Sequence, residues 1–339
     1  MTRKMIDCLN EVKAYPAVDV DKDLCYQKNY QVNSWFYVAR GNCEENEIVF
    51  LYHASTYKFP GQAGILISNL TFNNQTTGER HVESVVYPLE QVEFGEDRLY
   101  IKCPNAEVSG DINAMYVKAD TSIGSIDVKI VPVEYPLYNS RTGRYIMLDL
   151  DIHQYAFPNM ETTGKINIKG KDYDFNGNSW LDRQWQIDLS MIDPENPPEM
   201  DLTIFPTWGW FAMTLETGEN LSIWFPKDKG KWHAWATVLY PDGMHTLVHV
   251  DNVFETADNW FHHEDSPYTY ATKYTVRIPE YDAELVVTSG PIDQEIRNDV
   301  AAAFNIYEGT CSVTGTWKGK PIKGVAFLEM IGTWIKELL

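Results

Sequence analysis

Short runs in which hydrophobic and polar residues alternate cover almost the whole chain. A two-residue repeat puts successive side chains on opposite faces and is typical of β-strands. The first half has such runs at residues 34–39, 47–53, 64–72, 82–87, 98–103, 125–131, 144–152 and 165–175. The second half has them at residues 209–216, 220–225, 233–239, 244–250, 271–278, 283–288, 310–317 and 321–330. The pattern predicts an all-β fold.

Several joins between these runs carry residues that suit tight turns. Glycine accepts positive φ, and the pairs Gly170-Lys171, Thr217-Gly218, Asp242-Gly243 and Lys318-Gly319 stand where one run ends and the next begins. Antiparallel meanders are therefore expected, in which strands that follow one another in the chain also pair. The segment 293–304 instead has the pattern of one short helix near the C-terminal end, over one end of a barrel.

A domain boundary is predicted at residues 192–200. This segment holds three prolines and three acidic residues, which no regular element tolerates. It divides the chain into an N-terminal domain, 1–191, a linker, 192–200, and a C-terminal domain, 201–339. With about eight strands each, both domains could close into up-and-down barrels that hold one small apolar ligand.

Charge and cysteine content exclude several classes of function. The formal net charge of −20 disfavours partners with anionic backbones, so no nucleic acid is expected. No apolar run resembles a signal peptide or approaches the length of a membrane span, which predicts a cytoplasmic protein without membrane insertion. The five cysteines are odd in number and form no C-x-x-C pair, so reduced thiols are expected, with no metal site and no cofactor.

The stretch from Asn178 to Gln186 carries the candidate chemistry. On a strand, Trp180, Asp182 and Gln184 would share one face, and Leu181, Arg183 and Trp185 the other. An apolar wall raises the pKa of a carboxyl and a nearby cation lowers it, so Asp182 is a candidate acid or base. The alternative is a structural carboxylate that accepts hydrogen bonds from backbone donors.

Aromatic residues make up 13% of the chain, which is more ring surface than a core alone needs. Rings with polar tips suit the wall of an apolar cavity. The alternative is that a large β-protein simply places aromatic side chains on its strands.

Four motifs in order resemble a known family. They are Trp35-Phe36-Tyr37 with Gly41; Trp180-Leu181-Asp182-Arg183-Gln184-Trp185; Trp208-Gly209-Trp210-Phe211 with Gly218; and Tyr307-Glu308-Gly309 with Gly315, Gly324 and Glu329. The chain resembles the two-domain lipocalin-like family of carotenoid 1,2-hydratases (hydroxyneurosporene synthases), AttH-type proteins and fungal decalin-forming Diels–Alderases. The resemblance implies two lipocalin-like β-barrel domains packed side by side, with an aromatic cleft between them.

The resemblance also implies a set of site residues. The candidate catalytic residues are Asp182, Arg183 and Tyr37. The candidate substrate-binding residues are Trp35, Trp180, Gln184, Trp185, Trp208 and Trp210. Arg183 and Gln184 stand where hydratase-like members have His and Glu, and Gly209 stands where an acid is typical, so the hydratase residues do not carry over as a set.

Three functions stay open at this point. A hydratase or dehydratase needs a proton donor, aromatic faces beside the cation and a positioned water, and Asp182 among tryptophans suits it. A cyclase of the Diels–Alderase type needs mainly a shaped cavity and a donor such as Arg183 or Tyr37. A carrier needs only the cavity. Each would take a hydrophobic, unsaturated, isoprenoid- or polyketide-like small molecule, whose identity the sequence does not give. It leaves the oligomeric state equally open.

Overall fold

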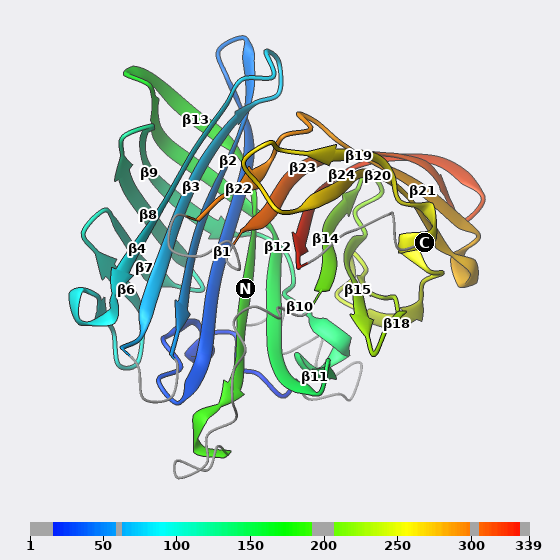
Figure 1. The fold of residues 1–339 in the computed structure, drawn as a ribbon, viewed down its shortest axis with the longest axis horizontal. Helices are drawn as coiled ribbons and strands as arrows, with labels where there is room; N and C mark the ends of the chain where they lie inside the picture. The colour runs from blue at the N-terminus through cyan, green and yellow to red at the C-terminus, as the bar shows by residue number, and fades with distance from the viewer. Residues whose placement is uncertain (1–15, 59–62, 192–206, 299–304, 333–339) are drawn as a thin grey trace. The chain divides into compact units, whose positions relative to one another are not determined.

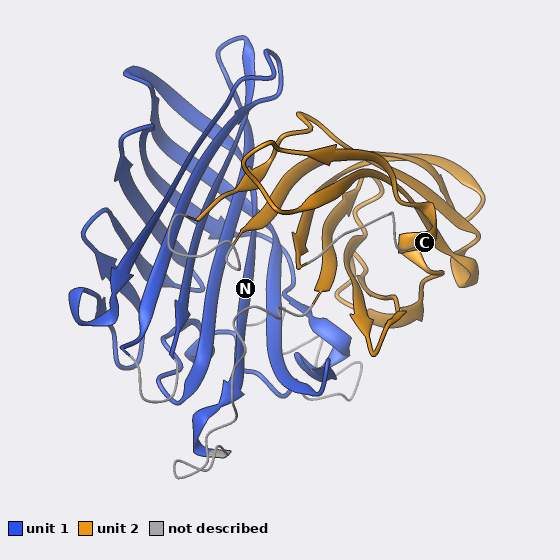
Figure 2. Ribbon diagram, viewed as in Figure 1, with its two compact units in different colours: residues 1–199 blue, residues 200–339 orange. Residues whose placement is uncertain are grey.

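The computed structural model describes residues 16–58, 63–191, 207–298 and 305–332. The chain divides into two compact units, residues 1–199 and residues 200–339 (Figure 2). In both units the described residues form one antiparallel sheet with short connections. The all-β fold class is confirmed. The predicted linker falls on residues outside the described ones.

Unit 1 contains a sheet of thirteen strands (Figure 1). The path across it runs β4-β3-β2-β1-β13-β12-β9-β8-β7-β6-β5, and β10 and β11 both pair with β12. The strands are β1 (Tyr30–Cys43), β2 (Asn46–Tyr57), β3 (Ile65–Asn74), β4 (Arg80–Pro88), β5 (Glu93–Phe94), β6 (Leu99–Cys103), β7 (Ala106–Asp111), β8 (Ala114–Thr121), β9 (Gly124–Pro132), β10 (Leu137–Tyr138), β11 (Arg144–Met147), β12 (Leu150–Ile168) and β13 (Lys171–Asp188). Most neighbours along the chain pair, as the turn chemistry predicts, but β1 pairs with β13, and β12 pairs with β9 and β10.

The β1–β13 pairing brings the two ends of unit 1 together in the middle of its sheet. Trp35 lies opposite Arg183 and Phe36 lies opposite Asp182. Odd-numbered residues of β1 and β13 face a large hydrophobic core that includes Tyr37, Tyr155 and Leu181. Even-numbered residues face the other way, so the motif around Asp182 is divided between the two faces of one strand.

Unit 2 contains a sheet of eleven strands. Its path runs β18-β17-β15-β14-β24-β23-β21-β20-β19, with β16 on β15 and β22 on β23. The strands are β14 (Thr207–Leu215), β15 (Asn220–Asp228), β16 (Lys231–Trp232), β17 (Trp235–Leu239), β18 (His245–His249), β19 (Asp258–His262), β20 (Thr269–Ile278), β21 (Ala283–Ser289), β22 (Glu295–Ile296), β23 (Ile306–Trp317) and β24 (Lys320–Ile331).

The hydrophobic core of unit 2 lies on one face of this sheet. Phe211 stacks on Phe225 at 5.0 Å, and Tyr274 meets both rings edge-on. Trp208 and Trp210 alternate with Phe211 along β14, so they project from the opposite face. In unit 1, by contrast, Trp35 and Trp185 belong to the core and Trp180 lies on the other face.

Only short 3-10 helices interrupt the strands of the described chain. They are η1 (Lys22–Leu24), η2 (Leu89–Gln91), η3 (Asn139–Arg141), η4 (Leu189–Met191), η5 (Val253–Thr256) and η6 (Pro279–Tyr281). In the segment where a helix was predicted, residues 295–296 form β22 instead, and residues 299–304 lie outside the described ones. Among the described helices, none has the length and apolar character needed to traverse a bilayer. Cys25, Cys43, Cys103 and Cys311 are free thiols.

A tight contact at Gly315 holds β23 against β21. Gly315 has φ +144, and an added Cβ there would overlap the Glu284 carbonyl oxygen. We predict that Gly315→Ala lowers the free energy of unfolding by about 2–3 kcal/mol, because the backbone must both change conformation and separate from β21. Urea denaturation measures this loss.

Gly230 is the matched control. It has φ +82 with open space around its Cβ position, so Gly230→Ala should cost only about 1 kcal/mol. Equal losses for the two variants would contradict the close approach of β23 to β21.

Candidate functional site

The two faces of β13 separate the predicted site residues into two groups. Trp180, Asp182 and Gln184 lie on one face, which we call the Asp182 face. Leu181, Arg183 and Trp185 lie on the core face, as the alternation of a strand predicts. Trp35 and Tyr37 of β1 lie on the core face as well. The structure therefore does not bring Arg183 or Tyr37 next to Asp182.

Arg183 is fully buried and surrounded by acceptors. Its guanidinium donates to the carbonyl oxygens of Asp23 at 2.9 Å, Cys25 at 2.7 Å and Gln184 at 2.7 Å, and to Asn33 Oδ1 at 3.0 Å. It also lies over two indole rings, with its central carbon 4.2 Å from Trp35 and 4.9 Å from Trp185. Burial lowers the pKa of Arg183 to about 10, so it remains a cation at neutral pH.

These contacts tie the segment around η1 to the sheet. Trp35 takes part by donating its indole N–H to the Leu24 carbonyl at 2.8 Å. Tyr37 is buried nearby, its hydroxyl is 3.6 Å from Met115 Sδ, and burial raises its pKa well above the usual value. Arg183 and Tyr37 thus have structural partners in the core, and their catalytic role stays a prediction.

Asp182 is held by a chain of side chains on the other face. Gln154 Nε2 lies 3.0 Å from each carboxylate oxygen of Asp182, and the Tyr145 hydroxyl donates to Gln154 Oε1. Gln154 is on β12 and Tyr145 on β11, so three strands contribute. Asp182 is 4% exposed and Gln154 is 1% exposed. A buried carboxylate held through both oxygens has a fixed orientation, which a catalytic group requires.

A histidine lies on the same face, two strands away. The registers β2–β1 and β1–β13 align His53, Phe36 and Asp182 in one row across the sheet. Strand spacing puts His53 and Asp182 roughly 10 Å apart, with the Phe36 ring between them. His53 Nε2 lies 2.9 Å from Ser34 Oγ, and burial lowers the pKa of His53 to about 4, which makes it a neutral imidazole at pH 7.

In unit 2, Trp208 and Trp210 lie beside an acidic residue of β24. Trp208 donates its indole N–H to Glu329 Oε1 at 2.8 Å, and Trp210 donates to Ser222 Oγ at 2.8 Å. Glu329 in turn lies opposite Glu308 of β23. Burial raises the pKa of Glu329 to about 7, against the opposing effect of the Trp208 hydrogen bond.

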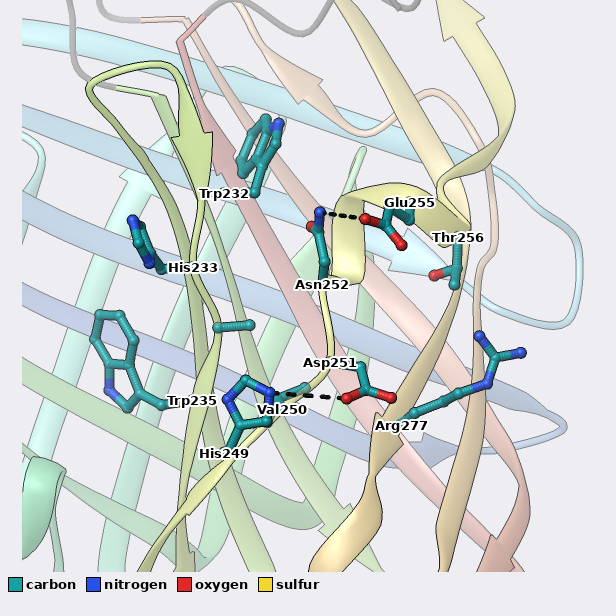
Figure 3. Close-up of a pocket in the computed structure, with 11 residues that line it drawn as sticks. Trp232, His233, Trp235, His249, Val250, Asp251, Asn252, Glu255, Thr256 and Arg277 are labelled. Atoms are coloured by element: carbon teal, nitrogen blue, oxygen red, sulfur yellow. Dashed lines mark hydrogen bonds and ion pairs between the residues drawn. The ribbon is translucent and has the colours of Figure 1, made fainter.

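Unit 2 also has an open pocket of about 870 Å³ (Figure 3). Trp232, His233 and Trp235 line one side, and Thr256 and Arg277 line the other. Between them, His249 Nε2 lies 3.7 Å from Asp251 Oδ1, and Asn252 donates to Glu255. The lining is mixed in charge and largely exposed, with little of the apolar wall that a hydrophobic ligand needs. In the described residues no group of three or more His, Cys, Asp or Glu side chains is placed to bind a metal ion.

Sequence reasoning missed Gln154 and the pairing of Glu308 with Glu329, and it named these two glutamates only within a motif. The signal for the two glutamates was present, because each is a lone acid within an apolar strand. The Lys318-Gly319 turn pairs Trp317 with Lys320, and counting outward from it sets Glu308 opposite Glu329. Gln154 reaches Asp182 through the β12–β13 hairpin, whose register shifts between Phe157 and Met160, so counting outward from the Gly170-Lys171 turn does not predict this contact.

The family of this chain follows from comparison with known proteins. The profile of AttH-like proteins matches residues 16–333. The chain belongs to the AttH-like family. This covers nearly all of the chain, including every strand described above, and agrees with the four motifs in the sequence.

Two solved structures resemble this AttH-like protein in fold. Kievitone hydratase from Nectria haematococca has a TM-score of 0.79 and 17% identity, over 95% of this chain and 95% of that chain. An AttH protein from Nitrosomonas europaea has a TM-score of 0.76 and 16% identity, over 94% of this chain and 98% of that chain.

One curated relative also matches. The dehydratase asqC of Emericella nidulans is 23% identical over 206 residues, or 58% of this AttH-like chain. The match covers 55% of that relative, so this chain spans about half of its length.

The partners of Arg183 give a stability prediction. Lysine cannot reproduce a planar fork that binds several carbonyl oxygens and stacks on two rings. We therefore expect Arg183→Lys to lower the free energy of unfolding by about 3 kcal/mol or more, measured by urea denaturation.

Arg144 provides the control for this measurement. It forms a bidentate but exposed ion pair with Asp151, so Arg144→Lys should cost less than about 1 kcal/mol. An Arg183→Lys variant as stable as the wild type would show that these hydrogen bonds contribute little.

Proposed function

We propose that this protein is a hydratase or dehydratase that requires no cofactor, and that Asp182 is its catalytic base. The observation that carries the proposal is the oriented Asp182 carboxylate on a face of unit 1 that also presents aromatic and apolar side chains. The aromatic cleft predicted between the two domains remains a prediction.

The surroundings of Asp182 suit proton transfer. A carboxylate that accepts hydrogen bonds from Gln154 through both oxygens is held ready to receive a proton, and Tyr145 fixes the orientation of Gln154. In dehydration, Asp182 would take the proton from carbon while the hydroxyl on the neighbouring carbon leaves as water. In hydration, it would take a proton from the attacking water. His53 and Ser34 are further hydrogen-bonding groups on this face, across Phe36 from Asp182.

The same face favours a hydrophobic substrate. Phe36, Val38 and Trp180 border Asp182 in the register of β1 with β13, and Leu51 continues the apolar surface on β2. Aromatic faces stabilise a developing carbocation, as alkene hydration requires. We therefore propose an unsaturated isoprenoid- or polyketide-like small molecule as the substrate.

The relatives support the reaction class. One matching protein is named a dehydratase and a structural neighbour a hydratase, and the two reactions are the same equilibrium approached from opposite sides. The relatives therefore support the addition or removal of water as the reaction class. They do not support a particular substrate, because sequence identity is low and the curated match covers about half of that relative.

Replacing Asp182 tests its role. Asp182→Asn keeps the shape of the side chain and removes the proton acceptor, so we expect kcat to fall by about 100-fold or more, with a melting temperature close to that of the wild type. Asp174→Asn on the same strand is the matched control, because Asp174 is exposed and forms an exposed ion pair with Lys165. A collapse in melting temperature with turnover intact would assign Asp182 a purely structural role.

Labelled water tests the reaction class. The wild-type protein is incubated in H2 18O or D2O with kievitone and with a panel of isoprenoid alkenes and tertiary alcohols, and the products are analysed by mass spectrometry. A hydratase introduces solvent oxygen on one carbon and solvent hydrogen on its neighbour, and a dehydratase releases water with a loss of 18 mass units. An isomeric product without label would instead indicate a cyclase, and an unchanged ligand a carrier.

A further inference from the structure

A row of aromatic and acidic side chains crosses one face of the unit 2 sheet. The registers of five consecutive strands align Trp235, Trp224, Trp210, Glu329 and Glu308, in that order. The Trp210 and Trp224 rings lie 6.0 Å apart, and Trp208 meets Trp224 edge-on at 6.4 Å. Four indoles and two carboxyl groups therefore share one face of the sheet, and the hydrophobic core of unit 2 lies on the opposite face.

Some side chains of this row are buried, and others remain partly exposed to solvent. Trp210, Trp224 and Glu308 are buried, with Glu308 at 0% exposure. Trp208 and Glu329 keep part of their surface exposed. A ligand would therefore meet the Trp208 ring and the Glu329 carboxyl, while the buried members fix their positions from behind.

The register sets the two carboxyl groups directly opposite each other on neighbouring strands. Residues directly opposite each other on antiparallel strands have Cβ atoms about 5 Å apart, and like charges there repel. Two carboxylates at such a distance do not both ionise easily in a buried setting, so one retains its proton. Burial already raises the pKa of Glu329 to about 7, which leaves a large fraction of it protonated at neutral pH.

Trp208 orients the Glu329 carboxyl and offers an aromatic surface to an unsaturated substrate. Trp208 holds Glu329 Oε1 at 2.8 Å and so directs the other carboxyl oxygen, Oε2, as the proton-carrying atom. Its ring face provides an apolar surface that also stabilises positive charge on carbon. Trp210 is in turn fixed by its hydrogen bond to Ser222.

We propose that Glu329, supported by Glu308, is a proton-donating catalytic residue of this enzyme, with Trp208 as the surface that positions the unsaturated part of the substrate. The proposal rests on the proposed hydratase or dehydratase function and adds the acid to it. It places acid chemistry on unit 2.

The step balances in both directions. In dehydration, the Glu329 proton goes to the leaving hydroxyl oxygen, which takes the electrons of the C–O bond and departs as water. The electrons of a neighbouring C–H bond form the new double bond, its proton goes to a water molecule, and Glu329 is reprotonated from solvent. In hydration, the alkene electrons take the Glu329 proton to form a C–H bond, and water adds to the resulting cation. The surplus proton of that water goes to solvent, and Glu329 is reprotonated from solvent.

A first experiment observes the proton without using turnover. The indole N–H resonance of Trp208, identified as the one lost in Trp208→Phe, is followed by 15N-resolved NMR of the full chain from pH 4 to 9. It should shift with a midpoint near 7 in the wild type, shift with a lower midpoint in Glu308→Gln, and remain still in Glu329→Gln. Glu284→Gln, an exposed position on β21, should behave as the wild type. A wild-type midpoint below 5, or one unchanged in Glu308→Gln, would overturn the pair.

Thermal stability gives a second readout of the same proton. The folded-state pKa of Glu329 lies above the usual glutamate value, so the stability that its proton confers is present at acidic pH and is lost as the pH rises through about 7. The wild-type melting temperature relative to Glu329→Gln should therefore fall between about pH 4.5 and pH 7.5 and stay level above that. A constant difference across this range would contradict the raised pKa.

Turnover then tests catalysis. With the substrate found in labelled water, Glu329→Gln should lose at least about 100-fold in kcat, and Glu308→Gln should shift the alkaline limb of the kcat/KM profile to lower pH. If wild-type protein turns over substrate and Glu329→Gln does so equally well, this inference is wrong while the proposed function stands. If wild-type protein incorporates no label from any probe, the proposed function fails and the inference fails with it.

Discussion

The buried guanidinium of Arg183 is the interaction on which unit 1 depends. A fully buried cation is costly unless every donor has a partner, and here carbonyl oxygens of Asp23, Cys25 and Gln184 accept its hydrogen bonds while two indoles cover its faces. Those carbonyls belong to the segment around η1 and to β13. The guanidinium therefore joins the beginning and the end of the unit, where β1 and β13 pair.

That anchoring has a consequence for the neighbouring residue. With Arg183 fixed in the core, strand geometry turns Asp182 to the opposite face, where Gln154 meets it. Arg183 and Asp182 are adjacent in one motif, yet their side chains have different partners. Arg183 donates to carbonyl oxygens in the core, and Asp182 accepts from Gln154 on the opposite face. The same division occurs in unit 2, where Phe211 packs in the core and Trp208 and Trp210 project from the other face.

Much of the fold could be predicted from the local pattern of the sequence. The alternation of polar and apolar residues gave the strands, and the Asp242-Gly243 and Lys318-Gly319 turns gave antiparallel neighbours with fixed register. The face of each residue in the Asp182 motif also followed, since it needs only a period of two. The helix predicted from residue 293 shows the limit, because residues 295–296 pair with β23 and a long-range partner overrides a local helical preference.

The sequence by itself determined the all-β class, the hairpins and the face on which each motif residue lies, because these depend on contacts between near neighbours in the chain. It also contained the Glu308–Glu329 pair, through the register of one hairpin. Only the tertiary structure decided that β1 joins β13, that Gln154 holds Asp182 and that Arg183 binds carbonyls around η1. These contacts join residues 28 to 160 positions apart, and pairing at that range is set by packing of the whole sheet.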